Sequence, residues 1–175
     1  MVKGLHPLGT EDLKIEQFSV PVTNGTVFYR KCAAIATSGG VAAVWSSSGD
    51  NANYIGPVMG IYDSNKVELN YLPVSTAGYV DVATNKELKL KVQADGAISE
   101  TDRFNVADLA SNSGTASTGN STAVLSASTG TGCSLFTVIG RIETPGNAWD
   151  NTTAPEFVVT AYKHKLNKAA GSGGL

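Results

Sequence analysis

The chain offers few side chains that could carry out chemistry. Its two imidazoles are His6 and His164, and its two thiols are Cys32 and Cys133. His164 stands between two lysines in an alternating apolar and polar run, which indicates an exposed histidine on a strand. Each cysteine lacks a second Cys or a His at the spacing of a zinc site. We therefore expect both thiols to be buried as small apolar groups.

The acidic residues form no catalytic or metal-binding pattern. Asp95, Glu100 and Asp102 lie close together, but the ligand spacing of an EF-hand is missing. No phosphate-binding glycine loop or nucleophile elbow is present. Trp45, Trp149 and the tyrosines could form a platform for a sugar, although such residues more often fill a core or an interface in β-rich chains. The sequence therefore predicts a protein that is not an enzyme and needs no cofactor or metal.

The overall composition argues against two classes of partner. Charged residues make up only 16% of the 175 residues, and the net charge is −2, so no basic field attracts nucleic acid. No apolar run approaches the roughly 20 residues that span a membrane. The N-terminal residues show no apolar stretch typical of a secretion signal, and we expect synthesis in the cytoplasm.

Short β-type runs separated by turn residues dominate the chain. Val67, Leu69 and Tyr71 alternate with polar residues, which places them on one face of a strand. Asn24-Gly25 lies between two β-rich runs and predicts a hairpin. No long segment has the 3.6-residue period of a helix. We therefore predict an all-β fold, a small barrel or sandwich of about eight to ten short antiparallel strands with long Ser/Thr/Gly-rich loops and extended termini.

The compositional changes along the chain suggest its organisation. Residues 111–134 are nearly all small and hydroxylated, which is typical of a flexible insertion loop or of an ordered surface that packs on a partner. Val124 and Leu125 lie in this segment and favour a docked strand. We expect an N-terminal arm at 1–19, a β domain at 20–166 and a flexible tail at 167–175.

Several stretches resemble a known family. They are GIYDSNK at 60–66, NYLPVSTAG at 70–78, VIGRIETPGNAW at 138–149 and the closing YKH at 162–164. Together they are similar to capsid decoration (cement) proteins of tailed bacteriophages. The resemblance implies a small β domain on the outside of the virion capsid, often a homotrimer, that clamps neighbouring subunits of the major capsid protein. It implies neither enzyme activity nor a cofactor.

Partner contacts are expected at the two ends of the chain. The arm carries a cluster of acids and the C-terminal segment carries lysines without nearby acids, although solvated, frayed ends would look the same. The candidate partner-binding residues are Glu11, Asp12, Glu16, Trp149, Lys163, Lys165 and Lys168. Other interpretations are a different virion component, such as a head-fibre base or tail protein, or a carbohydrate-binding β-sandwich that uses Trp45 or Trp149. A hydrolase that depends on His164 comes last.

Overall fold

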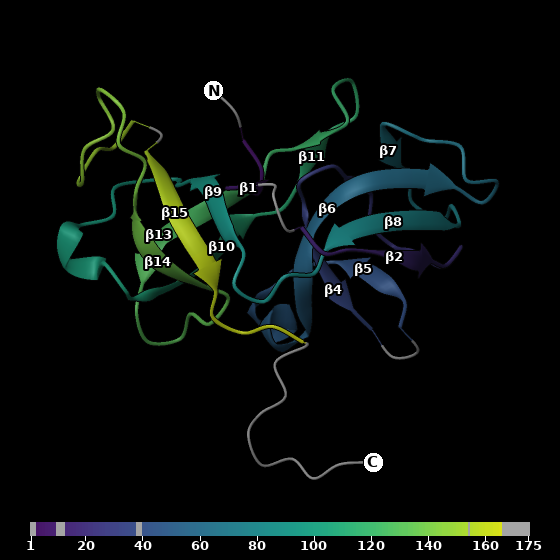
Figure 1. The fold of residues 1–175 in the computed structure, drawn as a ribbon, viewed down its shortest axis with the longest axis horizontal. Helices are drawn as coiled ribbons and strands as arrows, with labels where there is room; N and C mark the ends of the chain where they lie inside the picture. Colours follow the sequence, from purple (N-terminus) through teal and green to yellow (C-terminus); the bar gives the residue numbers. More distant parts are fainter. Residues whose placement is uncertain (1–2, 10–12, 38–39, 154, 166–175) are drawn as a thin grey trace, which may run out of the picture.

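The predicted all-β class is confirmed by the computed structural model, which describes residues 3–9, 13–37, 40–153 and 155–165. Two curled antiparallel sheets lie side by side (Figure 1). The arrangement is sandwich-like and contains no closed barrel in the described part of the chain, so the barrel alternative is wrong. Neither of the two short 3-10 helices, η1 (Ser48–Asn53) and η2 (Glu100–Asp102), is long or apolar enough to cross a membrane.

The first sheet has six strands. In spatial order they are β1 (His6–Pro7), β9 (Lys89–Gln93), β15 (Glu156–Ala161), β14 (Phe136–Arg141), β10 (Val106–Ser111) and β13 (Val124–Thr129). The sheet curls strongly, so that β13 comes back beside the end of β9, where an isolated parallel bridge joins Ala94 and Leu125. Alternate residues such as Phe157 and Val159 point inward and are fully buried.

The second sheet has five strands and curls in the same way. In spatial order they are β2 (Ile15–Val20), β8 (Gly78–Ala83), β6 (Tyr54–Asp63), β4 (Ala33–Ala36) and β5 (Ala42–Val44). A parallel bridge between Ser19 and Val41 brings its two edge strands together. Two small pairs complete the fold: β3 (Phe28–Tyr29) with β7 (Tyr71–Leu72), and β11 (Gly114–Thr115) with β12 (Asn120–Ser121).

Strand β4 belongs to two hydrophobic cores. Ala33 and Ile35 pack into the core of the six-stranded sheet, whereas Ala34 packs into the core of the five-stranded sheet. Side chains of a strand alternate between its faces, so a strand buried on both faces needs apolar residues throughout. The sequence Ala-Ala-Ile-Ala meets this requirement, so β4 contributes side chains to both hydrophobic cores.

Two asparagine side chains join the sheets by hydrogen bonds. The Nδ2 of Asn112 donates to the carbonyl oxygens of Ala33 (3.0 Å) and Trp45 (3.1 Å), and its Oδ1 accepts from the Ala33 amide (2.8 Å). Asn51 accepts from the indole nitrogen of Trp45 (2.7 Å) and donates to Asp108 (2.8 Å) on β10. These bonds satisfy polar groups that would otherwise be stranded at the junction.

The Ser/Thr/Gly-rich segment 111–134 carries three of the strands. It contains β11 and β12, and β13 begins at Val124, where a docked strand was expected. Leu125 is fully buried in the core of the six-stranded sheet. Small hydroxylated residues therefore surround an apolar strand that anchors this segment.

The predicted hairpin at Asn24-Gly25 is wrong. The strand before it, β2, pairs with β8, and the strand after it, β3, pairs with β7. Asn24 is buried, and its Oδ1 accepts from the amide of Thr26 (3.1 Å), while its own carbonyl accepts from the amide of Ser75 (2.8 Å). The asparagine thus forms an Asx turn held against another loop, and the chain changes direction there without pairing its flanking strands.

Candidate partner-binding surfaces

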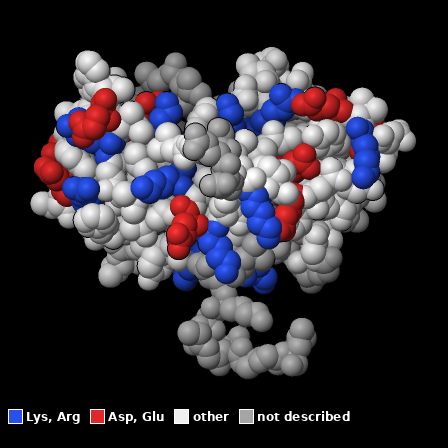
Figure 2. All heavy atoms as spheres, in the orientation of Figure 1, with Lys and Arg blue, Asp and Glu red and all other residues white. Residues whose placement is uncertain are grey.

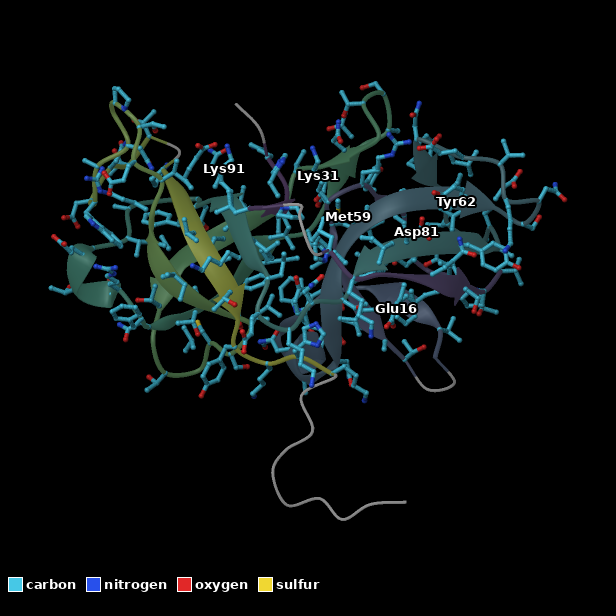
Figure 3. All side chains as sticks on the ribbon, viewed as in Figure 1. Glu16, Lys31, Met59, Tyr62, Asp81 and Lys91 are labelled. Carbon is cyan, nitrogen blue, oxygen red and sulfur yellow. The ribbon has the colours of Figure 1, made fainter. Side chains whose placement is uncertain are left out.

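Of the three acidic candidates in the N-terminal arm, only Glu16 lies among the described residues. Glu11 and Asp12 lie outside the described residues, as does Lys168 at the other end. Glu16 lies on β2, on the five-stranded sheet (Figure 3), and forms an ion pair with Lys14. The Glu16 side chain is 37% exposed, so it remains partly accessible beside its lysine partner.

The two described lysines of the C-terminal segment differ in their attachment. Lys163 is exposed and lies after the end of β15. Lys165 donates from its backbone amide to the Tyr54 carbonyl (2.7 Å) and from Nζ to Oδ1 of Asn53 (2.9 Å). Lys165 therefore fastens the end of the described chain to the start of β6.

The prediction that His164 is an exposed strand residue is wrong. Strand β15 ends at Ala161, and His164 turns inward to a buried position. Its ring meets Tyr54 edge-on, with centroids 5.8 Å apart. Burial lowers the pKa of His164, because the charged imidazolium loses hydration there. The histidine serves as a packing residue at the junction of the sheets.

Trp149 is half-buried and leans on the core of the six-stranded sheet. The centroid of its ring lies 5.5 Å from the centroid of the Phe157 ring. Pro145-Gly146-Asn147 forms the turn that precedes it: the Asn147 amide donates to the Thr144 carbonyl, and Gly146 has a φ of 81°. The Asn147 side chain fixes this turn to Glu156, accepting from its amide at 2.9 Å.

The structure does not gather the described candidates into one site. Glu16 belongs to β2 in the five-stranded sheet, Trp149 packs beside β15 in the six-stranded sheet, and Lys165 binds next to β6. Any partner that uses all of them has to span both sheets.

A rigid tip at Arg103 and Phe104 was not predicted from the sequence. Phe104 is 64% exposed and has a φ of 71°. The left-handed region costs a residue with a side chain about 1–2 kcal/mol, so a bulky aromatic there marks stored strain. The Arg103 guanidinium lies 5.0 Å from the centre of the Phe104 ring.

Backbone hydrogen bonds hold this tip in place. The Phe104 amide donates to the Val138 carbonyl (2.7 Å), and Nε of Arg103 donates to the Ile139 carbonyl (2.9 Å). The Asn105 side chain donates to Asp102 at 3.0 Å. Arg and aromatic residues carry much of the energy of protein interfaces, and a preorganised pair loses little freedom on binding. Neither the exposure of Phe104 nor its positive φ can be read from the residue types, so the sequence does not predict the tip.

Metal ligands and thiols were the remaining groups that could carry chemistry. They include no group of three or more His, Cys, Asp or Glu side chains able to hold a metal ion. Cys32 is buried as predicted, and desolvation raises its pKa to about 12. Cys133 is only half-buried and donates from Sγ to the Ser128 carbonyl (3.4 Å), so the expectation of burial is wrong for this thiol.

No protein-family model, curated protein or solved structure matches the chain.

Proposed function

We propose that this protein is a non-enzymatic decoration protein that binds the outer surface of an assembled phage capsid. In this role it bridges subunits of the major capsid protein and acts as a homotrimer, after synthesis in the host cytoplasm. The proposal starts from the resemblance of residues 60–78 and 138–149 to such proteins. These stretches run through β6 to β8 and from β14 into the Pro145 turn.

The observation that carries the proposal is the Arg103–Phe104 tip. A strained aromatic residue held in the solvent, with an arginine fixed beside it, suits an anchor that enters a pocket on a protein partner. On the face shown in Figure 2, charged side chains are scattered with uncharged areas between them, whereas the tip itself carries Glu100, Asp102 and Arg103 beside Phe104. A partner that covers the uncharged areas removes little water from charged groups.

Capsid stabilisation would follow from selective binding. A ligand that binds only the assembled shell shifts the equilibrium toward that state by mass action. Three copies joined in a trimer would combine weak contacts through their high effective concentration. We therefore expect a trimer at micromolar concentration in sedimentation equilibrium; a mass of one chain would contradict the preformed trimer.

The direct test mixes the protein with purified expanded heads. We expect co-sedimentation and greater heat resistance of the heads. Phe104→Ala should weaken binding by about 30-fold, the effect of losing a strong anchor residue. The matched control is Val22→Ala, which removes an apolar side chain of similar exposure (60%) elsewhere.

Two results would contradict the proposal. Absence of binding to every capsid state rejects the decoration role, and equal binding by the Phe104→Ala variant rejects the anchor. Electron microscopy of the particles separates a capsid position from a head-fibre or tail position.

A further inference from the structure

The outer face of the five-stranded sheet carries a second, different kind of surface. Tyr62 on β6 and Tyr79 on β8 lie directly opposite each other in the antiparallel register. Cross-strand partners share one face of a sheet, so both phenol rings belong to the same surface. Figure 3 shows Tyr62 and Asp81 on these neighbouring strands. We call this surface, made of Gln17, Tyr62, Lys66, Tyr79 and Asp81, the tyrosine face.

Gly60 determines how the Tyr62 ring lies. A Cβ atom at Gly60 would be only 2.9 Å from the Tyr62 hydroxyl and 3.1 Å from its Cε2 atom. The ring therefore lies along the sheet over this glycine, in space that any side chain would fill. One ring face rests on the backbone, and the half-exposed side chain turns its other face outward.

A fixed polar edge adjoins the ring. The Tyr62 hydroxyl donates to Oδ2 of Asp81 (3.0 Å), and Nε2 of Gln17 donates to Oδ1 of the same carboxylate (3.1 Å). Each carboxylate oxygen keeps a second lone pair for another donor. On the other side of the face, Nζ of Lys66 lies 5.3 Å from the centre of the Tyr79 ring. Three strands and the turn after β6 thus hold aromatic and hydrogen-bonding groups on one face of the sheet.

The charges of this surface favour a neutral ligand. Asp81 and Lys66 carry opposite charges, and the adjoining Glu68 is paired with Arg30 at 2.7 Å. An anion or a cation would therefore meet no excess of opposite charge. A pyranose sugar has an apolar C–H face that can cover an aromatic ring and a rim of hydroxyls that can reach a carboxylate, an amide and an ammonium group.

We propose that the tyrosine face binds a neutral carbohydrate, stacked on Tyr62 and hydrogen-bonded to Asp81 and Gln17. This site differs from the tryptophan platform considered from the sequence, since Trp45 is buried and Trp149 is half-buried against Phe157. It is independent of the capsid-binding role and leaves the Arg103–Phe104 tip free.

The test titrates the isotope-labelled full chain with three neutral hexasaccharides, cellohexaose, chitohexaose and maltohexaose, and follows amide shifts by NMR. We expect at least one sugar to shift residues of β2, β6 and β8 with a Kd on the order of 1 mM or tighter. Tyr62→Ala should weaken that binding by about tenfold or more, and Gly60→Ala, which lifts the ring, should also weaken it.

Controls keep the outcome readable. Tyr162→Ala removes another exposed tyrosine (54%) and should leave sugar binding unchanged. If the Tyr62→Ala variant does not fold, Tyr62→Phe takes its place in the comparison. This variant keeps the aromatic ring, so it should lose less affinity for the sugar than Gly60→Ala does. Absence of shifts with all three sugars, or unchanged affinity in Gly60→Ala and Tyr62→Ala, overturns the proposal. Loss of head binding by Tyr62→Ala without sugar binding would make this face a protein contact, which overturns the carbohydrate site but not the capsid role.

Discussion

Replacing Asn112 tests how the two sheets are joined. Its side chain makes three hydrogen bonds with the backbone of Ala33 and Trp45, at 2.8, 3.0 and 3.1 Å. In Asn112→Ala the amide of the fully buried Ala33 loses its acceptor, whereas the Ala33 carbonyl keeps the Trp45 amide at 3.0 Å. A hydrogen bond contributes about 0.5–1.5 kcal/mol net, and a stranded buried donor costs about 1–3 kcal/mol. We expect the free energy of unfolding to fall by about 2–4 kcal/mol.

The assay is urea denaturation followed by tryptophan fluorescence and by circular dichroism. Trp45 is buried beside the lost bonds, so its fluorescence reports on the junction. The control is Asn120→Ala, because this residue is exposed and its side chain donates only to the nearby Thr118 carbonyl among the contacts described. It should change stability by less than about 0.5 kcal/mol.

Two results would refute this reasoning. A loss below about 0.5 kcal/mol in Asn112→Ala would mean that water replaces the side chain at little cost. A variant in which fluorescence and dichroism report separate transitions would mean that the sheets unfold independently. The charged variant Asn112→Asp sharpens the test, since its carboxylate would face the Ala33 and Trp45 carbonyl oxygens and should destabilise at least as much at neutral pH.

Three further predictions concern pH, thiol chemistry and backbone space. Burial lowers the pKa of His164 in the folded protein below its ordinary 6.5. As the pH falls, the imidazole is therefore protonated in the unfolded chain before it is protonated in the folded one. The free energy of unfolding should decline below about pH 6.5 and level off once the pH is below the pKa of His164 in the folded protein. His164→Gln should flatten this part of a stability-against-pH curve, leaving the contribution of His6, whose pKa burial also lowers; an unchanged slope would contradict the assignment. In native protein at pH 8, maleimide should modify Cys133 and spare Cys32, whose pKa is about 12, as read by mass spectrometry of peptides; equal labelling would mean that the core opens readily. Gly56→Ala should prevent folding or cost more than about 3 kcal/mol, because its Cβ would collide with the Ala83 carbonyl at a φ of 144°, whereas Gly140→Ala, with open space, should be nearly neutral in the same melts.

Local patterns fit several strands, and the docked strand expected at Val124 and Leu125 is part of β13. The β-branched run after Leu135 forms β14, and the run from Gly78 to Ala83 is β8. Alternation alone was less reliable at Val67, which is 58% exposed: between 67 and 72 the pairing is interrupted, with an isolated bridge from Glu68 to Tyr62 and then the short β7 at Tyr71 and Leu72. Apolar alternation describes one face of an extended segment but does not say whether a partner strand is present to cover it.

The functional surfaces depended on non-local information. The sequence marks Asn112 as one of many small polar residues, and only the fold brings it to Ala33. Likewise, Tyr62 becomes a flat platform because β6 and β8 place Gly60 and Asp81 beneath and beside it. His164 was expected to stay on a strand, but β15 ends three residues earlier and the packing of Tyr54 decides its position.

The double burial of β4 has a consequence for any attempt to divide the chain. A fragment that kept only the five-stranded sheet would leave Ala33, Ile35, Trp45 and Tyr54 facing water, and a fragment without it would lack one side of its own interior. An exposed apolar surface of that kind promotes aggregation. The five-stranded and six-stranded sheets should therefore fold, and be expressed, only as one unit.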